Sequence, residues 1–234
     1  MAVSIDTVYQ RVLAILNKEN RGYVTPQEFN LFANQAQLEV FEQYFFDLNQ
    51  YNRLPKNDSE YSDLPKLINE KLSKFKQSAS ISYMTDHFHL PTDFHKLGTV
   101  IYNNTTPVEQ IDKKNLLEYQ LSKLTAPTTN NPVYIQSRAN TQSHWAIHVY
   151  PTTITSNISI TYVRKPNSVA WTSQTVAGNA LYNASASTDF ELHASEETNL
   201  VLKILLYAGV SIKDPNIAQL ADAKETKKLT QEKS

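Results

Sequence analysis

The sequence predicts an α+β fold, in which helices from both chain ends form a bundle and the middle of the chain is rich in β-strands. In the first third of the chain and again near its end, apolar residues recur every three or four positions, as amphipathic helices require. Between these regions apolar and polar residues alternate, and prolines mark the turns. We expect N-terminal helices over 1–76, a β-rich segment over 77–190 with a loop or arm at about 167–188, and C-terminal helices over 191–234.

The first third predicts three helices. The first carries an apolar stripe that ends before Gly22, and its members are Ile5, Val8, Val12, Ile15 and Leu16. The second begins at Thr25, where Pro26 takes the first helical position and Glu28 completes a capping box. A more polar third helix is expected over residues 62–75.

The second helix has more apolar surface than one neighbour would cover, because Phe41, Phe45 and Phe46 widen its stripe. Two interpretations stay open. These aromatic rings either contact another subunit or pack within the chain against the last apolar helix.

In the middle of the chain, twofold alternation predicts strands near residues 79–90, 97–102, 132–136, 145–150 and 158–163. A short helix over 113–124 interrupts them. Residues 167–188 are rich in small polar side chains and predict the loop or arm.

Two helices are expected at the end. Ser195 is the predicted N-cap of the first, with Glu196 and Glu197 in its first turn, where the helix dipole favours acids. The second starts at Asp214 and becomes very polar toward Ser234.

Composition excludes several classes of protein. The net charge is −1, without the basic excess typical of a DNA-binding domain. There are no cysteines for disulfides, thiolate metal sites or cysteine catalysis, and the 4 glycines form no phosphate-binding loop. We expect no secretory signal and no membrane span. The 13 tyrosines suit either protein interfaces or an ordinary β-rich core.

Two patterns could hold metal ions. Residues 17–28 partly match a calcium-binding loop, but Arg21 stands where a ligand belongs, and a helix hairpin with a capping box explains Gly22 and Glu28 equally well. His87 and His89 share a strand face, with Asp93 or His95 as a possible third ligand. Because Phe88 and Leu90 define the buried face, we expect this histidine pair to point to solvent.

The other candidates are weaker, and we predict no catalytic, cofactor-binding or metal residue. His144 and His148 share a strand face at a separation too long for one ion unaided. Arg164 and Lys165, beside Tyr162 and before Trp171, could contact nucleic acid, but an ordinary strand end at a subunit contact is favoured. The C-terminal lysines alternate with glutamates, as on a solvated helix.

The order of features along most of the chain resembles the ring, or neck, proteins of virions in the crAss-like phage group. More distantly it resembles the tail tubular protein A and head-to-tail adaptor family of short-tailed phages. The segments that carry the resemblance are residues 41–49, 90–94, 149–151, 160–166 with Trp171, and 189–192 leading into 195–197.

The resemblance implies a non-enzymatic structural subunit with a helical bundle and a β-rich portion. Such a subunit assembles with itself into a closed ring, expected to be dodecameric, and contacts the portal protein and adjacent ring or tail proteins. DNA passes through the ring as non-specific cargo. The expected location is the neck or tail of the virion, after synthesis in the cytoplasm of the bacterial host. The alternative is another phage tail or fibre-attachment component.

Overall fold

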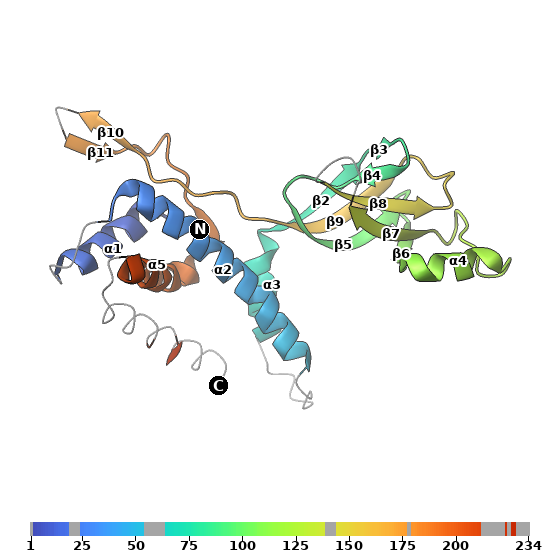
Figure 1. Cartoon of the computed structure of the whole chain (residues 1–234), viewed down its shortest axis with the longest axis horizontal. Helices are drawn as coiled ribbons and strands as arrows, with labels where there is room; N and C mark the ends of the chain where they lie inside the picture. The colour runs from blue at the N-terminus through green and yellow to red at the C-terminus, as the bar shows by residue number, and fades with distance from the viewer. Residues whose placement is uncertain are drawn as a thin grey trace. The chain divides into compact units, whose positions relative to one another are not determined.

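The computed structural model describes residues 2–18, 24–53, 64–138, 144–176, 179–211, 223 and 226–227. The chain divides into two compact units, and each is drawn in Figure 1. The helical unit comprises Met1–Lys74 and Pro166–Ser234, and the sheet unit comprises Phe75–Lys165. This arrangement confirms the predicted α+β class, with helices from both chain ends and a β-sheet in the middle.

The helical unit is built around α1 (Ile5–Lys18), α2 (Pro26–Arg53) and α5 (Glu197–Ser211). The N-terminal helices α1 and α2 pack on α5 (Figure 1), and α3 (Leu64–Ser73) contacts α2. The predicted stripe of α1 is fully buried at Ile5, Val8, Val12 and Leu16, whereas Ile15 is 41% exposed at its edge.

The ends of the chain are also joined by backbone pairing. Strand β1 (Ala2–Val3) pairs antiparallel with β12 (Phe190–His193). The backbone N–H of Ile5 donates to the Asp189 carboxylate at 2.9 Å, so the start of α1 is fixed to the segment that leads into β12.

The capping box predicted at the start of α2 is confirmed. The Thr25 backbone N–H donates to a Glu28 carboxylate oxygen at 2.9 Å, and the Glu28 N–H donates to the Thr25 hydroxyl at 3.3 Å. Two backbone donors that the helix leaves unpaired are thereby satisfied. The Thr25 backbone N–H and its hydroxyl, the latter at 2.8 Å, both donate to the Glu28 carboxylate and lower its pKa.

One polar face of α2 binds an extended segment, which we name the strap (residues 167–171). The Asn34 amide accepts from the Val169 N–H at 2.9 Å and donates to the Val169 carbonyl at 2.8 Å. Asn30 makes the same pair with Trp171, at 2.7 and 3.0 Å. Side-chain amides thus take the place of a neighbouring β-strand, because each offers a donor and an acceptor.

The ladder continues one turn further along α2. The buried Gln37 side chain donates to the Asn167 carbonyl at 2.7 Å and accepts from the Glu191 N–H at 3.2 Å. The Glu191 carboxylate in turn accepts from the Asn167 backbone N–H at 2.8 Å. The strap and β12 are therefore held by one continuous network.

The stretch predicted as a loop or arm contains a β-hairpin. Strand β10 (Ser173–Val176) pairs antiparallel with β11 (Asn179–Tyr182), and these two strands form a sheet of their own (Figure 1). Trp171 stacks on Tyr182 with ring centroids 6.0 Å apart, and Ala170 bridges to Thr188 at the base of the hairpin.

The start of α5 differs from the prediction. A 3-10 turn, η1 (Ala194–Glu196), precedes the helix, and the His193 side chain rather than Ser195 acts as its cap by accepting the Ser195 N–H at 3.3 Å. Strand β12 extends to His193, so Ser195 lies inside the turn and its hydroxyl contacts the His193 ring at 3.0 Å.

Polar contacts also tie α2 to α5. The Glu39 carboxylate accepts hydrogen bonds from the Tyr207 hydroxyl and from Lys203 Nζ. Burial alone would raise the pKa of Glu39, but these bonds, a bond from Gln35 and the Lys203 charge lower it.

The sheet unit contains one eight-stranded sheet in the order β2-β9-β5-β6-β7-β8-β4-β3. Its strands are β2 (Lys76–Ile81), β3 (Tyr83–Met84), β4 (His87–His89), β5 (Phe94–Tyr102), β6 (Thr106–Gln110), β7 (Val133–Arg138), β8 (Trp145–Tyr150) and β9 (Ile158–Arg164). Neighbouring strands are antiparallel except for β6 and β7. Strands β2 and β3 stand at opposite ends of this order, yet only Ser82 separates them in the chain, so the sheet is curled.

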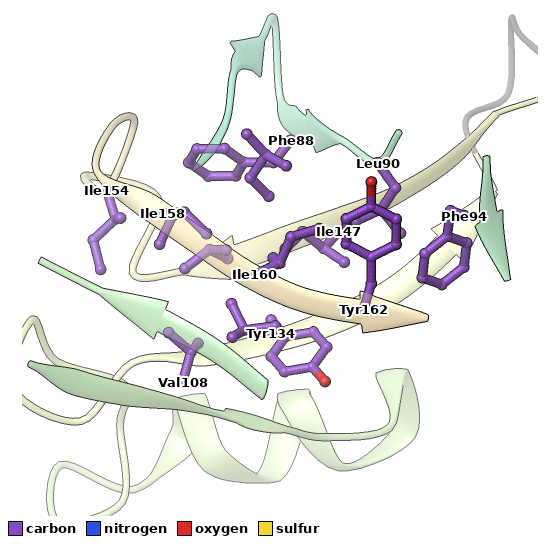
Figure 2. Packing of buried hydrophobic residues seen from close by; sticks show 13 residues of the cluster. Phe88, Leu90, Phe94, Val108, Tyr134, Ile147, Ile154, Ile158, Ile160 and Tyr162 are labelled. Carbon is purple, nitrogen blue, oxygen red and sulfur yellow. The ribbon is translucent and has the colours of Figure 1, made fainter. Parts of the chain in front are cut away.

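The core of the sheet unit lies inside this curl (Figure 2). Along β9 the alternate residues Ile158, Ile160 and Tyr162 are buried, as the twofold pattern predicts. Other strands contribute one or two large side chains each, among them Phe88, Phe94, Val108, Tyr134 and Ile147. Burial raises the pKa of the Tyr134 hydroxyl.

Helix α4 (Lys113–Leu121) follows β6 and ends three residues before the predicted boundary at 124, because Ser122 is already extended. Its Leu116 is buried in a small cluster with Ile111, Val133 and Ile135.

Some predictions fall outside the described residues. They are the stop at Gly22, the start of the third helix at Ser62, and nearly all of the last helix from Asp214 to Ser234. Among the helices of the described part, none has the length and apolar character that a membrane crossing requires.

Candidate functional site

Four histidines gather beside the paired strands β4 and β8. The register places Phe88 opposite Ile147 and His89 opposite Ala146, so His87 lies opposite His148. Since Phe88 and Ile147 are fully buried in the core, His87, His89 and His148 lie on the other face of this strand pair. His144 precedes β8, two residues before Ala146.

The imidazoles of this histidine cluster are close to one another. His87 Nε2 and His89 Nε2 are 3.1 Å apart. The His87 and His148 rings have centroids 5.6 Å apart, and those of His89 and His144 are 6.3 Å apart. The pair lies on the face away from the core, as predicted, but the His87 side chain is only 14% exposed. The rings of His89 and His148 lie beside it.

Asp86 orients two of these rings. It lies in the two-residue turn between β3 and β4, where Thr85 has a positive φ of 57°. The Asp86 carboxylate contacts His87 Nδ1 at 2.5 Å, and its backbone carbonyl contacts His148 Nδ1 at 3.2 Å. The hydrogen bond from His87 is the main reason why the pKa of Asp86 is lowered.

The predicted third ligands do not join this cluster. The Asp93 carboxylate accepts a hydrogen bond from the Tyr162 hydroxyl at 3.2 Å, and the Asp93 carbonyl accepts from the Lys165 N–H at 2.7 Å. His95 lies on β5, which is not a neighbour of β4 in the sheet. Burial and the adjacent Asp93 charge raise the pKa of Tyr162.

The adjacent glutamates at the junction of η1 and α5 pair with different cationic side chains. Glu196 is buried, and its carboxylate lies 2.6 Å from Lys71 Nζ and accepts from the Asn199 amide at 3.1 Å. Glu197 pairs with Arg11 at 2.7 Å. These contacts tie α3 and α1 to the start of α5, so both carboxylates have structural partners.

The aromatic residues considered for base stacking are buried within their own units. Trp171 is 6% exposed, and its indole N–H donates to the Asp6 carboxylate at 2.9 Å. Tyr162 is 5% exposed and its hydroxyl also contacts the Gln77 side chain at 3.2 Å. Arg164 lies over the Phe75 ring, 5.7 Å from its centroid.

A second candidate surface was not predicted from the sequence. Leu117 and Leu121, one turn apart on α4, are 66% and 85% exposed, and Leu124 in the following turn is 95% exposed. We name these residues the leucine row. Their spacing could have indicated it, but apolar residues three or four positions apart more often face a core.

No protein-family model matches the sequence, and no curated protein matches it either.

Proposed function

We propose that this chain is a structural subunit of a phage virion, which forms a ring in the head-to-tail connector through which DNA passes. The class of virion protein comes from the resemblance carried by segments such as residues 41–49 and 160–166. The fold is compatible with that class, since it combines helices from both chain ends with a β-sheet in the middle.

The observation that carries an assembly role is the leucine row. Transfer of one leucine side chain out of water contributes about 1.5–3 kcal/mol. Burial of Leu117, Leu121 and Leu124 at a contact would therefore contribute roughly 4–9 kcal/mol. Association of two subunits costs about 4–15 kcal/mol in lost translational and rotational freedom. The leucine row can therefore contribute to a stable contact, but other surface on the same partner must be buried as well.

A ring has the geometry for such a contact. In a closed ring each subunit presents one surface to the next subunit and receives a different surface from the previous one. The hairpin of β10 and β11 offers such a surface on the helical unit, because the outer edge of each strand lacks a strand neighbour in the described part. Unpaired strand edges readily pair with another chain.

The test is to mix the purified full-length chain with portal rings encoded by the same phage genome. Negative-stain electron microscopy and mass measurement would then report whether a new layer forms. We expect a layer with the symmetry of the portal, and twelve copies if the ring is dodecameric. No layer at high protein concentration, with neighbouring ring proteins also added, would contradict the proposal and favour a tail or fibre-attachment component.

Matched variants distinguish a specific contact from loss of folding. Leu117→Gln with Leu121→Gln should prevent layer formation without lowering the melting temperature, since both side chains are exposed. Asn115→Ala is the control, because Asn115 is exposed on the opposite side of α4. Normal layers from the double leucine variant would rule out the leucine row as the contact.

A further inference from the structure

We propose that His87 and His89 bind a divalent transition-metal ion, such as Zn²⁺, in a site whose ligands Asp86 orients. The inference rests on the positions of these side chains and is independent of ring assembly.

The separation of the two Nε2 atoms fits a shared ion. Zinc–nitrogen bonds are about 2.0–2.1 Å long, so two nitrogens on one ion lie about 2.9 Å apart at a right angle and about 3.3 Å apart at a tetrahedral angle. The observed 3.1 Å between His87 and His89 falls between these values. By this distance alone, both nitrogens can lie within bonding distance of one ion.

Asp86 sets the protonation pattern that a metal ligand needs. Because its carboxylate accepts the Nδ1 proton of His87, the lone pair of that ring lies on Nε2. Metal-binding histidines in proteins usually have such an acceptor on their other nitrogen.

His148 is the nearest candidate for a third ligand. Its Nδ1 contacts the Asp86 carbonyl, which likewise leaves Nε2 with a lone pair. Two imidazole rings bound to one tetrahedral ion have centroids about 5.2 Å apart. The centroid of the His87 ring lies 4.7 Å from that of His89 and 5.6 Å from that of His148, and both distances are close to this value. Among the described residues, no group of three or more His, Cys, Asp or Glu side chains is already placed to hold a metal ion. The preformed part is therefore the His87–His89 pair, and water or a rotated His148 completes the coordination.

The ligand set selects the class of metal. Imidazole nitrogens suit zinc, copper, nickel and cobalt, whereas calcium and magnesium prefer oxygen ligands. The two converging groups are both imidazoles, and Asp86 is held on the far nitrogen of His87 rather than beside the two Nε2 atoms. We therefore expect no binding of calcium or magnesium at this site.

Isothermal titration calorimetry of the full-length chain with ZnCl₂ tests the site. If a polyhistidine tag is used for purification, it must be removed first, because its histidines bind the same ions. We expect one Zn²⁺ per chain and no heat from CaCl₂. His89→Gln should weaken zinc binding at least about tenfold, and Asp86→Asn should weaken it about 10- to 100-fold by releasing the His87 ring. Asp86 is an exposed turn residue, so its substitution should leave the fold intact.

The matched control is His95→Gln, which removes a histidine of the sheet unit outside the cluster. The His95→Gln variant should bind zinc as the unmodified chain does. With added Cu²⁺, its continuous-wave EPR spectrum should show nitrogen coordination, which should be lost in His89→Gln. The proposal is overturned if the unmodified chain binds no zinc, or if His89→Gln and His95→Gln bind it equally.

Discussion

Replacement of Asn34 by alanine should destabilise the helical unit by detaching the strap from α2. The substitution leaves the Val169 N–H and carbonyl without the partners that now lie at 2.9 and 2.8 Å. Val169 is 2% exposed, so water cannot readily replace them. At about 1–2 kcal/mol for each of the two unsatisfied groups, less about 0.5 kcal/mol because alanine favours the helix, the expected loss is about 1.5–3.5 kcal/mol.

Tryptophan fluorescence during urea unfolding can measure this loss in the helical unit alone. The chain has 2 tryptophans, of which Trp145 lies in the sheet unit and is 46% exposed. In a Trp145→Phe background, the buried Trp171 becomes the reporter, and Trp171 itself lies at the end of the strap. The free energy of unfolding is then compared with and without Asn34→Ala.

Two further variants make the reasoning refutable. Gln35→Ala, one position along α2, removes only an exposed bond to Glu39 at 3.4 Å and should change the free energy of unfolding by less than about 0.5 kcal/mol. Asn34→Asp keeps an acceptor for the Val169 N–H but places an oxygen against the Val169 carbonyl, so it should also destabilise. If Asn34→Ala behaved like Gln35→Ala, the strap would not be held by these amides.

Three other substitutions test separate contacts by urea unfolding. Gly98→Ala should cost about 1–3 kcal/mol, because the added Cβ would lie 2.9 Å from the Thr161 carbonyl oxygen; an unchanged midpoint would contradict this. Lys71→Ala should cost about 2–4 kcal/mol by removing the ammonium group 2.6 Å from the buried Glu196 carboxylate. Adding Glu196→Gln should recover part of the loss. The lowered pKa of Glu39 means that this carboxyl contributes stability above pH 4.5, which is lost as the pH falls through its folded-state pKa. Glu39→Gln should therefore reduce stability at neutral pH, and by progressively less as the pH falls below 4.5; a reduction that does not change with pH would refute the assignment.

The features that were predictable from the sequence depend on neighbouring residues. The capping box needs only Thr25 and Glu28, which lie within one helical turn, and its bonds form as predicted. The alternation that buries Ile158, Ile160 and Tyr162 is likewise a property of one strand. Local spacing was sufficient in both places because the backbone period fixes which side chains share a face.

The strap could not be predicted because its partners are distant in the sequence. Asn30, Asn34 and Gln37 recur at helical spacing, but such a polar stripe usually marks a face in water. The segment that they bind lies more than one hundred positions further along the chain. Composition predicted a loop at 167–188 because the segment is rich in small polar residues. Such a composition does not reveal that side chains of a distant helix bond the backbone of the strap.

The candidate metal site was only partly predictable. The pair of His87 and His89 follows from strand alternation, but the approach of His148 depends on how β4 pairs with β8. A one-residue change of that register would turn the histidines of one strand to the other face. The role of Asp86 depends on a turn whose Thr85 has a positive φ, an uncommon conformation for a β-branched residue.

The way the sheet unit is inserted explains why helices from the two chain ends can form one bundle. Its first strand, β2, pairs with its last strand, β9, so that Lys76 at the start of β2 lies opposite Val163 near the end of β9. Just outside this pair, the Arg164 N–H donates to the Phe75 carbonyl at 2.9 Å. The chain therefore enters and leaves the sheet unit at two adjacent points. Closing the helical unit then costs about as much chain entropy as closing a short loop, however long the insertion is.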